Sequence, residues 1–218
     1  MTEATPWTFG EAPLAESLAL AAALRELAGN ALALEHPTPE IRDFTDEVLA
    51  VSKRLEAILP RDLRPRIGDD PAPDRRVYID HSRNIGEYNP CFPVYRLTCA
   101  DGRGEGEVDF PIVYEGPPGI VHGGFLALLF DCVLQHLNCD LGVAGKTVNI
   151  NVRYRRPTPL RTKLRIVATR EIVDRKILSN AQLFHEGELL CEAEMVAVAG
   201  TRDALPFVSP RKPPRDEH

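Results

Sequence analysis

The chain has 218 residues, a formal net charge of −6, 44% hydrophobic and 27% charged residues. These proportions are typical of a globular protein, and the length suits one core domain with an extension or two small domains. The acidic balance argues against nucleic acid or an anionic membrane as a partner of the whole surface. The five cysteines are an odd number without CxxC spacing, which is typical of reduced thiols, so we expect a cytoplasmic location.

The N-terminal part is predicted to be helical. Its start, MTEATPWTFGEAP, lacks the basic region and the continuous apolar run of a signal peptide. Helices are expected over residues 13 to about 33 and 39 to about 59, and charged residues exclude the first as a membrane span. We interpret the pair as a helical hairpin or arm that packs on the main domain and has a structural role. Their apolar stripes are Leu14, Leu18, Leu24 and Leu27, then Ile41, Phe44, Val48, Leu55 and Ile58.

The composition changes over residues 60–76, which are rich in Pro, Arg and Asp and are typical of a linker. We therefore place the domain boundary there. The resulting division is an N-terminal helical extension and linker (1–75), a main domain (76–200) and a mobile, Pro-rich tail (201–218).

The main domain is predicted to be one long helix with an antiparallel sheet. Two strands, over 94–99 and 106–114, are expected on either side of a Gly-rich turn at 101–107, with Pro111 at an edge or bulge. A helix over 123 to about 141 is apolar on nearly all sides, which is typical of a buried helix. Short turns then join strands over 164–173, 177–185 and 188–199, after an alternating strand at 147–155 (Val148, Ile150, Val152, Tyr154). The fold class is therefore α+β, with an antiparallel sheet wrapped around the central helix.

The stretch GPPGIVHGGFLALLFD, residues 116–131, combines two features that favour chemistry. A Gly- and Pro-rich loop leads into the helix at Gly123, whose first backbone N–H groups can bind an oxygen that develops negative charge. Asp131 is the only acidic residue between Gly123 and Leu137. A buried carboxylate is costly unless it is paired, so Asp131 is either functional or held by neighbouring hydroxyls or amides, and the pattern alone does not decide.

These segments resemble hotdog-fold acyl-CoA thioesterases of the PaaI-like group. The match rests on EGPPGIVHGG (115–124), on Asp131 nine residues after His122, and on TVNINVRYRRPTPL (147–160). Asp174-Arg175-Lys176 stands where that family often has Gly-Arg-Lys. The resemblance covers about residues 77–199 and leaves out the N-terminal helices.

The resemblance implies a homodimer with sheets joined edge to edge, hydrolysis of acyl-CoA in fatty acid metabolism, and no cofactor or metal. Asp131 would be the base or nucleophile, Thr147 would hold the attacking water or orient Asp131, and the Gly123 N–H, helped by Gly124, would bind the oxyanion. Several members carry Asn where this chain has Gly116, so a side-chain donor is lost here. Whether dimers pair into tetramers is left open.

Other residues have weaker assignments. His122 is expected to shape the loop through its ring, and Phe125, Leu128 and Leu129 to line the acyl tail. The basic residues Arg155, Arg156, Arg175 and Lys176 are either ligands of the CoA phosphates or solvated strand ends. Helical spacing of Cys132, His136 and Cys139 could suggest zinc, but no second ligand cluster completes a site, so core packing is favoured.

Geometry also bears on assembly. Gly123 and Asp131 are eight residues apart on one helix, so they lie about 12 Å apart along it and cannot flank one thioester carbonyl. A two-fold dimer would place Gly123 of one chain beside Asp131 of the other.

Two other functions compete with acyl-CoA hydrolysis. One is a non-catalytic acyl-CoA or lipid-binding hotdog module. The other is a hotdog dehydratase or hydratase, which ranks last.

Overall fold

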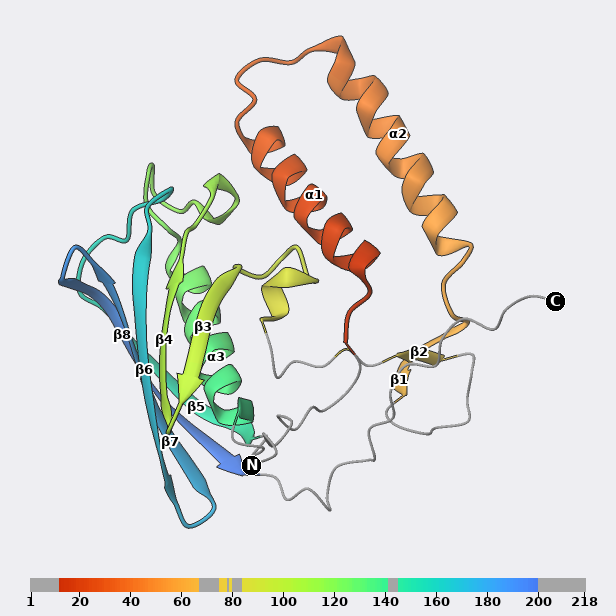
Figure 1. Cartoon of the computed structure of the whole chain (residues 1–218). Helices are drawn as coiled ribbons and strands as arrows, with labels where there is room; N and C mark the ends of the chain where they lie inside the picture. Colours follow the sequence, from red (N-terminus) through yellow and green to blue (C-terminus); the bar gives the residue numbers. More distant parts are fainter. Residues whose placement is uncertain (1–11, 67–74, 78, 80–83, 141–144, 200–218) are drawn as a thin grey trace.

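The protein is described by a computed structural model, in which residues 12–66, 75–77, 79, 84–140 and 145–199 are placed (Figure 1). A six-stranded antiparallel sheet, in the order β3-β4-β6-β7-β8-β5, curves around the long helix α3 (Gly123–Asp140). This confirms the predicted fold class. The strands are β3 (Tyr95–Ala100), β4 (Arg103–Val108), β5 (Gly145–Tyr154), β6 (Leu164–Val173), β7 (Lys176–His185) and β8 (Glu188–Ala199).

The core is the interface between α3 and the concave face of the sheet. Leu129, Phe130, Val133 and Leu134 of α3 are fully buried, because alternate residues of the strands point at the helix. Tight turns keep β6, β7 and β8 in register, and Asp174 and Glu186 take positive φ angles there. The three C-terminal strands therefore begin and end within a residue or so of the predicted ranges.

The prediction for residues 101–114 is wrong in one part. Gly104, assigned to the turn, and Gly106, assigned to both the turn and the second strand, lie inside β4, and a Cβ at Gly106 would come within 1.9 Å of the Arg96 carbonyl oxygen. Glycine is needed there because the neighbouring strand approaches so closely. The expected strand ends at Val108, and a 3₁₀ turn, η2 (Ile112–Tyr114), follows Pro111, which cannot donate a ladder hydrogen bond.

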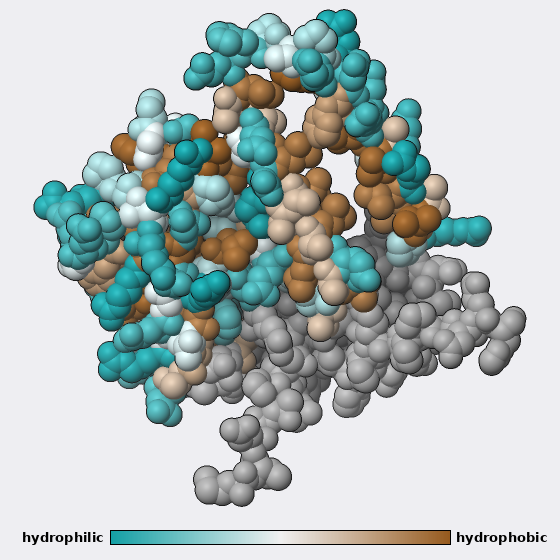
Figure 2. Space-filling view, turned by 45° about the horizontal axis from the view of Figure 1, so that its top comes forward, coloured by the Kyte–Doolittle hydropathy of each residue, from teal (hydrophilic) through white to brown (hydrophobic). Residues whose placement is uncertain are grey.

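The N-terminal arm consists of α1 (Ala15–Leu32) and α2 (Pro39–Glu56), and only α1 docks on the main domain. Its buried contact is made by Ala21 rather than by the predicted leucine stripe, of which Leu14 and Leu24 are exposed. None of the residues in α2 is buried, so the prediction that the whole pair packs on the domain is wrong for α2. Hydrophobic side chains remain exposed along the arm (Figure 2).

Two further segments complete the description. The expected linker contains β1 (Asp62–Arg66) and β2 (Arg75–Val77), a short parallel pair, and the predicted tail at 201–218 lies outside the described residues. A 3₁₀ turn, η1 (Ile85–Glu87), precedes β3. None of the helices placed in the structure is long and apolar enough to cross a membrane.

Candidate functional site

Thr147 reaches the helix because β5 carries a bulge. In the pairing of β5 with β8, Thr147 faces Ala197 and Asn149 faces Val196, so Val148 is the extra residue. The bulge moves Thr147 onto the helix-facing side of the sheet, the same side as Ile150, and leaves Val148 64% exposed. The simple alternation expected for this strand is therefore broken at Val148.

Asp131, Thr147 and Gln135 form one hydrogen-bonded group. The Thr147 hydroxyl donates to Oδ1 of Asp131 at 2.9 Å, and Nε2 of Gln135 donates to the same hydroxyl at 2.6 Å. Since Gln135 supplies a donor, the single proton of Thr147 is directed to the carboxylate. Asp131 is half-buried and Thr147 is exposed, so the carboxylate is less buried than the sequence suggested and water can reach it.

Within the described part of the chain, one backbone donor at the start of α3 has no partner. The N–H of Gly124 donates to Nδ1 of His122 at 3.0 Å, and those of Phe125 and Leu126 donate to the His122 carbonyl. The Gly123 N–H makes no hydrogen bond to any described residue. Gly124 is therefore occupied in capping the helix, and Gly123 is the donor at this end that remains available to a ligand.

Gly123 is held from two directions. Its carbonyl accepts a hydrogen bond from the Tyr154 hydroxyl at 2.8 Å, and a Cβ at Gly123 would meet the Tyr154 ring at 3.3 Å. A Cβ at Gly116 would lie 2.8 Å from Cα of His122, so this loop has no room for a side chain at this position. Both glycines are explained by close approach of other atoms.

The two halves of the site lie along the same edge of the molecule but not together. Asp131 is next to Thr147 near one end of β5, whereas Gly123 is next to Tyr154 at the other end. Eight residues of helix, about 12 Å, separate them. One chain therefore brings Asp131, Thr147 and Gln135 together and keeps Gly123, Gly124 and His122 apart from them.

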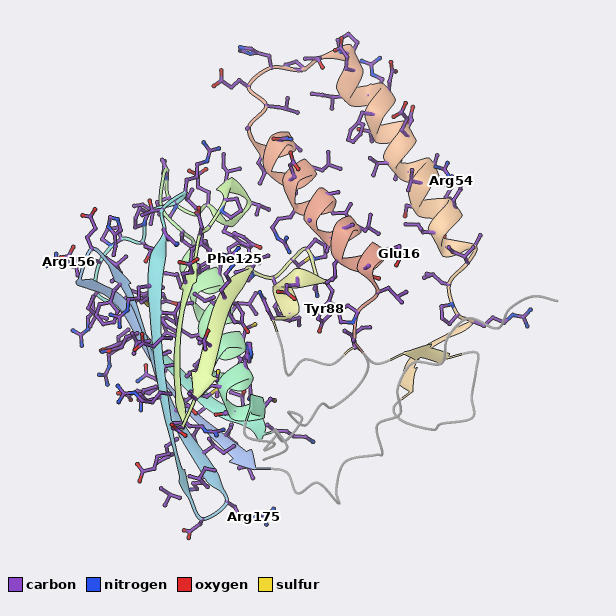
Figure 3. All side chains as sticks on the ribbon, viewed as in Figure 1. Glu16, Arg54, Tyr88, Phe125, Arg156 and Arg175 are labelled. Carbon is purple, nitrogen blue, oxygen red and sulfur yellow. The ribbon has the colours of Figure 1, made fainter. Side chains whose placement is uncertain are left out.

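The basic residues expected to bind the CoA phosphates also lie at two separate places. Arg156 and Arg175 lie at opposite ends of the sheet (Figure 3), with Arg155 and Lys176 beside them in the sequence. Arg155 pairs with Glu192 at 2.5 Å and Arg156 pairs with Glu188, and all four basic side chains are exposed. Within one chain they do not form a single cluster for phosphates.

Residues expected to line an acyl tail are only partly available. Phe125, labelled in Figure 3, and Leu128 are half-buried, and the ring of Phe125 stands edge-on to Tyr114 at 4.9 Å. Leu129 is fully buried in the core of its own chain, so the expectation that it lines the acyl tail is wrong. Further along α3, the Tyr95 hydroxyl contacts Nδ1 of His136 at 3.3 Å and donates to the Cys132 carbonyl.

The Cys132 thiol is not reactive at neutral pH. Burial, with a smaller effect from the Asp131 charge, raises the pKa of this thiol to about 12, which keeps it protonated.

Sequence reasoning missed Gln135 and Tyr154. Gln135 follows Asp131 by four residues, which places both on one helix face, so the spacing carried a signal. Tyr154 carried no such signal in the sequence, because its contact with Gly123 spans 31 residues of chain and depends on how the strand lies against the helix.

Comparison with solved structures agrees with this fold. A thioesterase superfamily protein of known crystal structure superposes with a TM-score of 0.72 at 27% identity, covering 90% of this chain and 98% of its own. A hypothetical thioesterase protein from Streptococcus pneumoniae, solved with coenzyme A, has a TM-score of 0.46 at 20% identity and covers 48% of this chain and 87% of its own. Zebra fish thioesterase superfamily member 2 has a TM-score of 0.46 at 19% identity, and the match covers 49% of this chain and 81% of the zebra fish chain. No protein-family model matches. The chain therefore has the hotdog fold, and the neighbour that superposes over most of its length is a thioesterase superfamily protein.

Proposed function

We propose that the protein is an acyl-CoA thioesterase, which hydrolyses the thioester of an acyl-CoA to a free acid and CoA. The observation that carries this is the hydrogen bond from Thr147 to Asp131, which presents an oriented carboxylate at a position that water can reach. A carboxylate held by a hydroxyl is suited to activate water or to attack a carbonyl. The Gly123 N–H at a helix start, which bonds to none of the described residues, supplies the second requirement, a donor for the oxyanion.

In the water-activated form of this mechanism, Asp131 takes a proton from water while the water oxygen attacks the thioester carbonyl carbon. The carbonyl oxygen becomes an oxyanion, which accepts a hydrogen bond from the Gly123 N–H. When the tetrahedral intermediate collapses, the C–S bond breaks and the CoA thiolate receives the proton from Asp131. If Asp131 attacks directly, an acyl-enzyme anhydride forms as the C–S bond breaks and CoA leaves as a thiolate. Water then hydrolyses the anhydride to the free acid and Asp131, and the proton released goes to the thiolate.

The site requires two chains, because Gly123 and Asp131 of one chain are too far apart. We propose a homodimer through β5, which is an edge strand and keeps Val148 and Tyr154 exposed. Asp131 and Thr147 of one chain would then act with Gly123 of the partner subunit. The same pairing would bring the basic residues of the two chains together around a CoA phosphate. Arg175 and Lys176 would lie on one side of it, and Arg155 of the partner subunit and Arg156 of the partner subunit on the other. Phe125 and Leu128 would contact the acyl tail.

A non-catalytic acyl-CoA-binding protein is the second candidate, and two observations favour it. Gly116 leaves no room for a side-chain donor, and Gly124 is already bonded to His122. Each site would have one oxyanion donor, and loss of a donor can cost about 10²–10³ in rate. The retained pair of Asp131 and Thr147 favours the enzyme.

Three finer points belong to the proposal. Within the PaaI-like group we propose a particular likeness to thioesterase superfamily member 4, on the motifs at 115–124 and 147–160. We propose a cytoplasmic location from the free cysteines and a role in fatty acid metabolism. The limits 1–75, 76–200 and 201–218 for the extension, the hotdog domain and the tail stay predictions.

The test is thiol release from a panel of acyl-CoAs, from acetyl and short aryl to palmitoyl, for wild type and Asp131→Asn. This substitution keeps the shape of the side chain and removes its charge. We expect wild-type turnover that falls by orders of magnitude in the variant, with acyl-CoA still bound. Binding without turnover in wild type would support the second candidate. Equal turnover in both proteins would show that Asp131 takes no part in the reaction.

A further inference from the structure

One cationic side chain of α1, Arg25, forms hydrogen bonds to the main domain. Arg25 lies on the same face as the buried Ala21, and its guanidinium spans two separate segments of the domain. Nη2 donates to the carbonyl oxygens of Gly86, of Asn89 at 3.2 Å and of Phe92 at 3.4 Å, and Nε donates to the Tyr114 hydroxyl at 3.2 Å. Among the described residues all four acceptors are neutral. The planar guanidinium of Arg25 therefore links these oxygens by hydrogen bonds and does not form an ion pair with them.

Tyr114 is the residue that Arg25 holds most specifically. It is 1% exposed, and its hydroxyl also donates to the Phe92 carbonyl at 2.6 Å. Burial raises the pKa of its phenol, and the nearby Arg25 lowers it by less, so the hydroxyl stays protonated and keeps donating. The hydroxyl thus accepts from Arg25 and donates to Phe92, which leaves it one settled orientation.

Tyr114 in turn touches both sides of Gly123. Its carbonyl accepts the His122 N–H at 2.9 Å, and its ring contacts the Phe125 ring edge-on at 4.9 Å between centroids. His122 precedes Gly123 and Phe125 follows it by two residues. The position of the Gly123 N–H therefore depends on where Tyr114 lies, and Tyr114 is anchored by α1.

We propose that Arg25 is a positioning residue for the Gly123 donor, and that α1 is part of the catalytic apparatus rather than a cover. This rests on the proposed function in one respect, because the effect on turnover presupposes hydrolysis. Without Arg25 the Tyr114 hydroxyl loses one of its two partners, and the loop from 116 to 126 gains freedom to move. A small misplacement of a catalytic donor can lower the rate by about ten- to a hundred-fold.

The experiment compares Arg25→Met and Tyr114→Phe with wild type. The first variant removes the fork, and the second keeps the ring and backbone of Tyr114 and removes only the hydroxyl, so α1 stays attached through the other acceptors of Arg25. Arg42→Met is the matched control, since Arg42 is exposed on α2. Two quantities are measured: kcat and KM for the best acyl-CoA, and hydrogen–deuterium exchange of peptides from residues 116–126.

We expect both variants to lower kcat more than they raise KM, to speed exchange over residues 116–126, and to leave exchange in β6, β7 and β8 unchanged. The control should match wild type in both measurements. Unchanged exchange in the loop of both variants would overturn the proposal, and so would unchanged kcat accompanied only by a lower melting temperature. If wild type shows no turnover, the proposed function fails, while loop exchange still decides whether Arg25 holds this loop.

Discussion

Replacement of Thr147 by Val tests the central contact of the site. Val has nearly the same shape and an equal preference for strands, but it cannot donate to Asp131 or accept from Gln135. Hydrogen bonds to a charged group are worth about 1.5–3 kcal/mol, and the exposed position of Thr147 favours the lower value. At about 1.4 kcal/mol for each factor of ten, kcat/KM should fall by about ten- to thirty-fold.

The assay is steady-state hydrolysis of the preferred acyl-CoA, with Thr147→Ser and Thr98→Val beside it. Ser keeps the hydroxyl and should retain most of the activity. Thr98 is exposed on β3, the opposite edge of the sheet, so its replacement controls for the same chemical change away from the site. The free energy of unfolding should also fall, by no more than about 1.5 kcal/mol, because the same hydrogen bonds are lost from the folded state at an exposed position. A Val variant with wild-type kcat/KM would refute the assignment of Thr147 to the reaction.

Three further predictions concern the loop, the sheet and a thiol. Gly116→Asn should lower both stability and activity rather than restore an oxyanion donor, because its Cβ would lie 2.8 Å from Cα of His122; urea unfolding and the thioesterase assay measure this, and higher activity would contradict it. Gly106→Ala should destabilise the protein more than Gly104→Ala, since the first Cβ meets a backbone oxygen at 1.9 Å and the second meets only a side chain at 3.2 Å; equal urea midpoints would count against this. The raised pKa of Cys132, about 12, means that the unfolded chain loses this proton first, so its contribution to stability is full below about pH 9 and decreases as the pH rises toward 12. Near pH 8, iodoacetamide should therefore label the exposed Cys91 well before Cys132, as peptide mass spectrometry would show.

Local pattern was enough to predict α3 and the three C-terminal strands. A long apolar run without Gly or Pro has few alternatives to a buried helix, and short polar turns between alternating strands fix an antiparallel meander. The pattern failed where a residue type has two uses. Gly104 and Gly106 have the composition of a turn, but both lie in β4, where Gly106 allows the backbone of β3 to approach and Gly104 faces the Leu97 side chain.

The candidate site was predictable in its residue types and not in its geometry. Alternation along 147–155 groups Val148 with Ile150 and would turn Thr147 away from the helix, whereas the bulge at Val148 reverses this. A bulge depends on how β5 pairs with β8, so the sequence of β5 alone does not predict it. Arg25 is a stronger case, since its contact with Tyr114 spans 89 residues and lies on a helix that the family resemblance did not cover.

A mixed dimer offers a direct test that each site is shared between two chains. β5 carries Thr147 near one end and Tyr154 at the other, and antiparallel pairing of two copies centred between Ile150 and Asn151 would set each end beside the opposite end of its partner. Gly123→Pro removes the N–H at the first position of α3, where the helix backbone tolerates Pro and the Tyr154 ring, 3.3 Å from a Cβ there, must shift slightly; Asp131→Asn removes the carboxylate. Each variant alone should be inactive.

When the two variants are unfolded together and refolded, half of the dimers should contain one chain of each kind. In such a dimer one site has both defects, and the other joins an intact Asp131 to an intact Gly123. Activity should therefore return to about a quarter of the wild-type value, since one site in four is complete. If both groups acted within one chain, every site would carry a defect and no activity would return. Pairing through β3 predicts the same failure, because none of the proposed site residues lies on that strand. Recovery thus identifies both the shared site and the edge of the sheet that forms it.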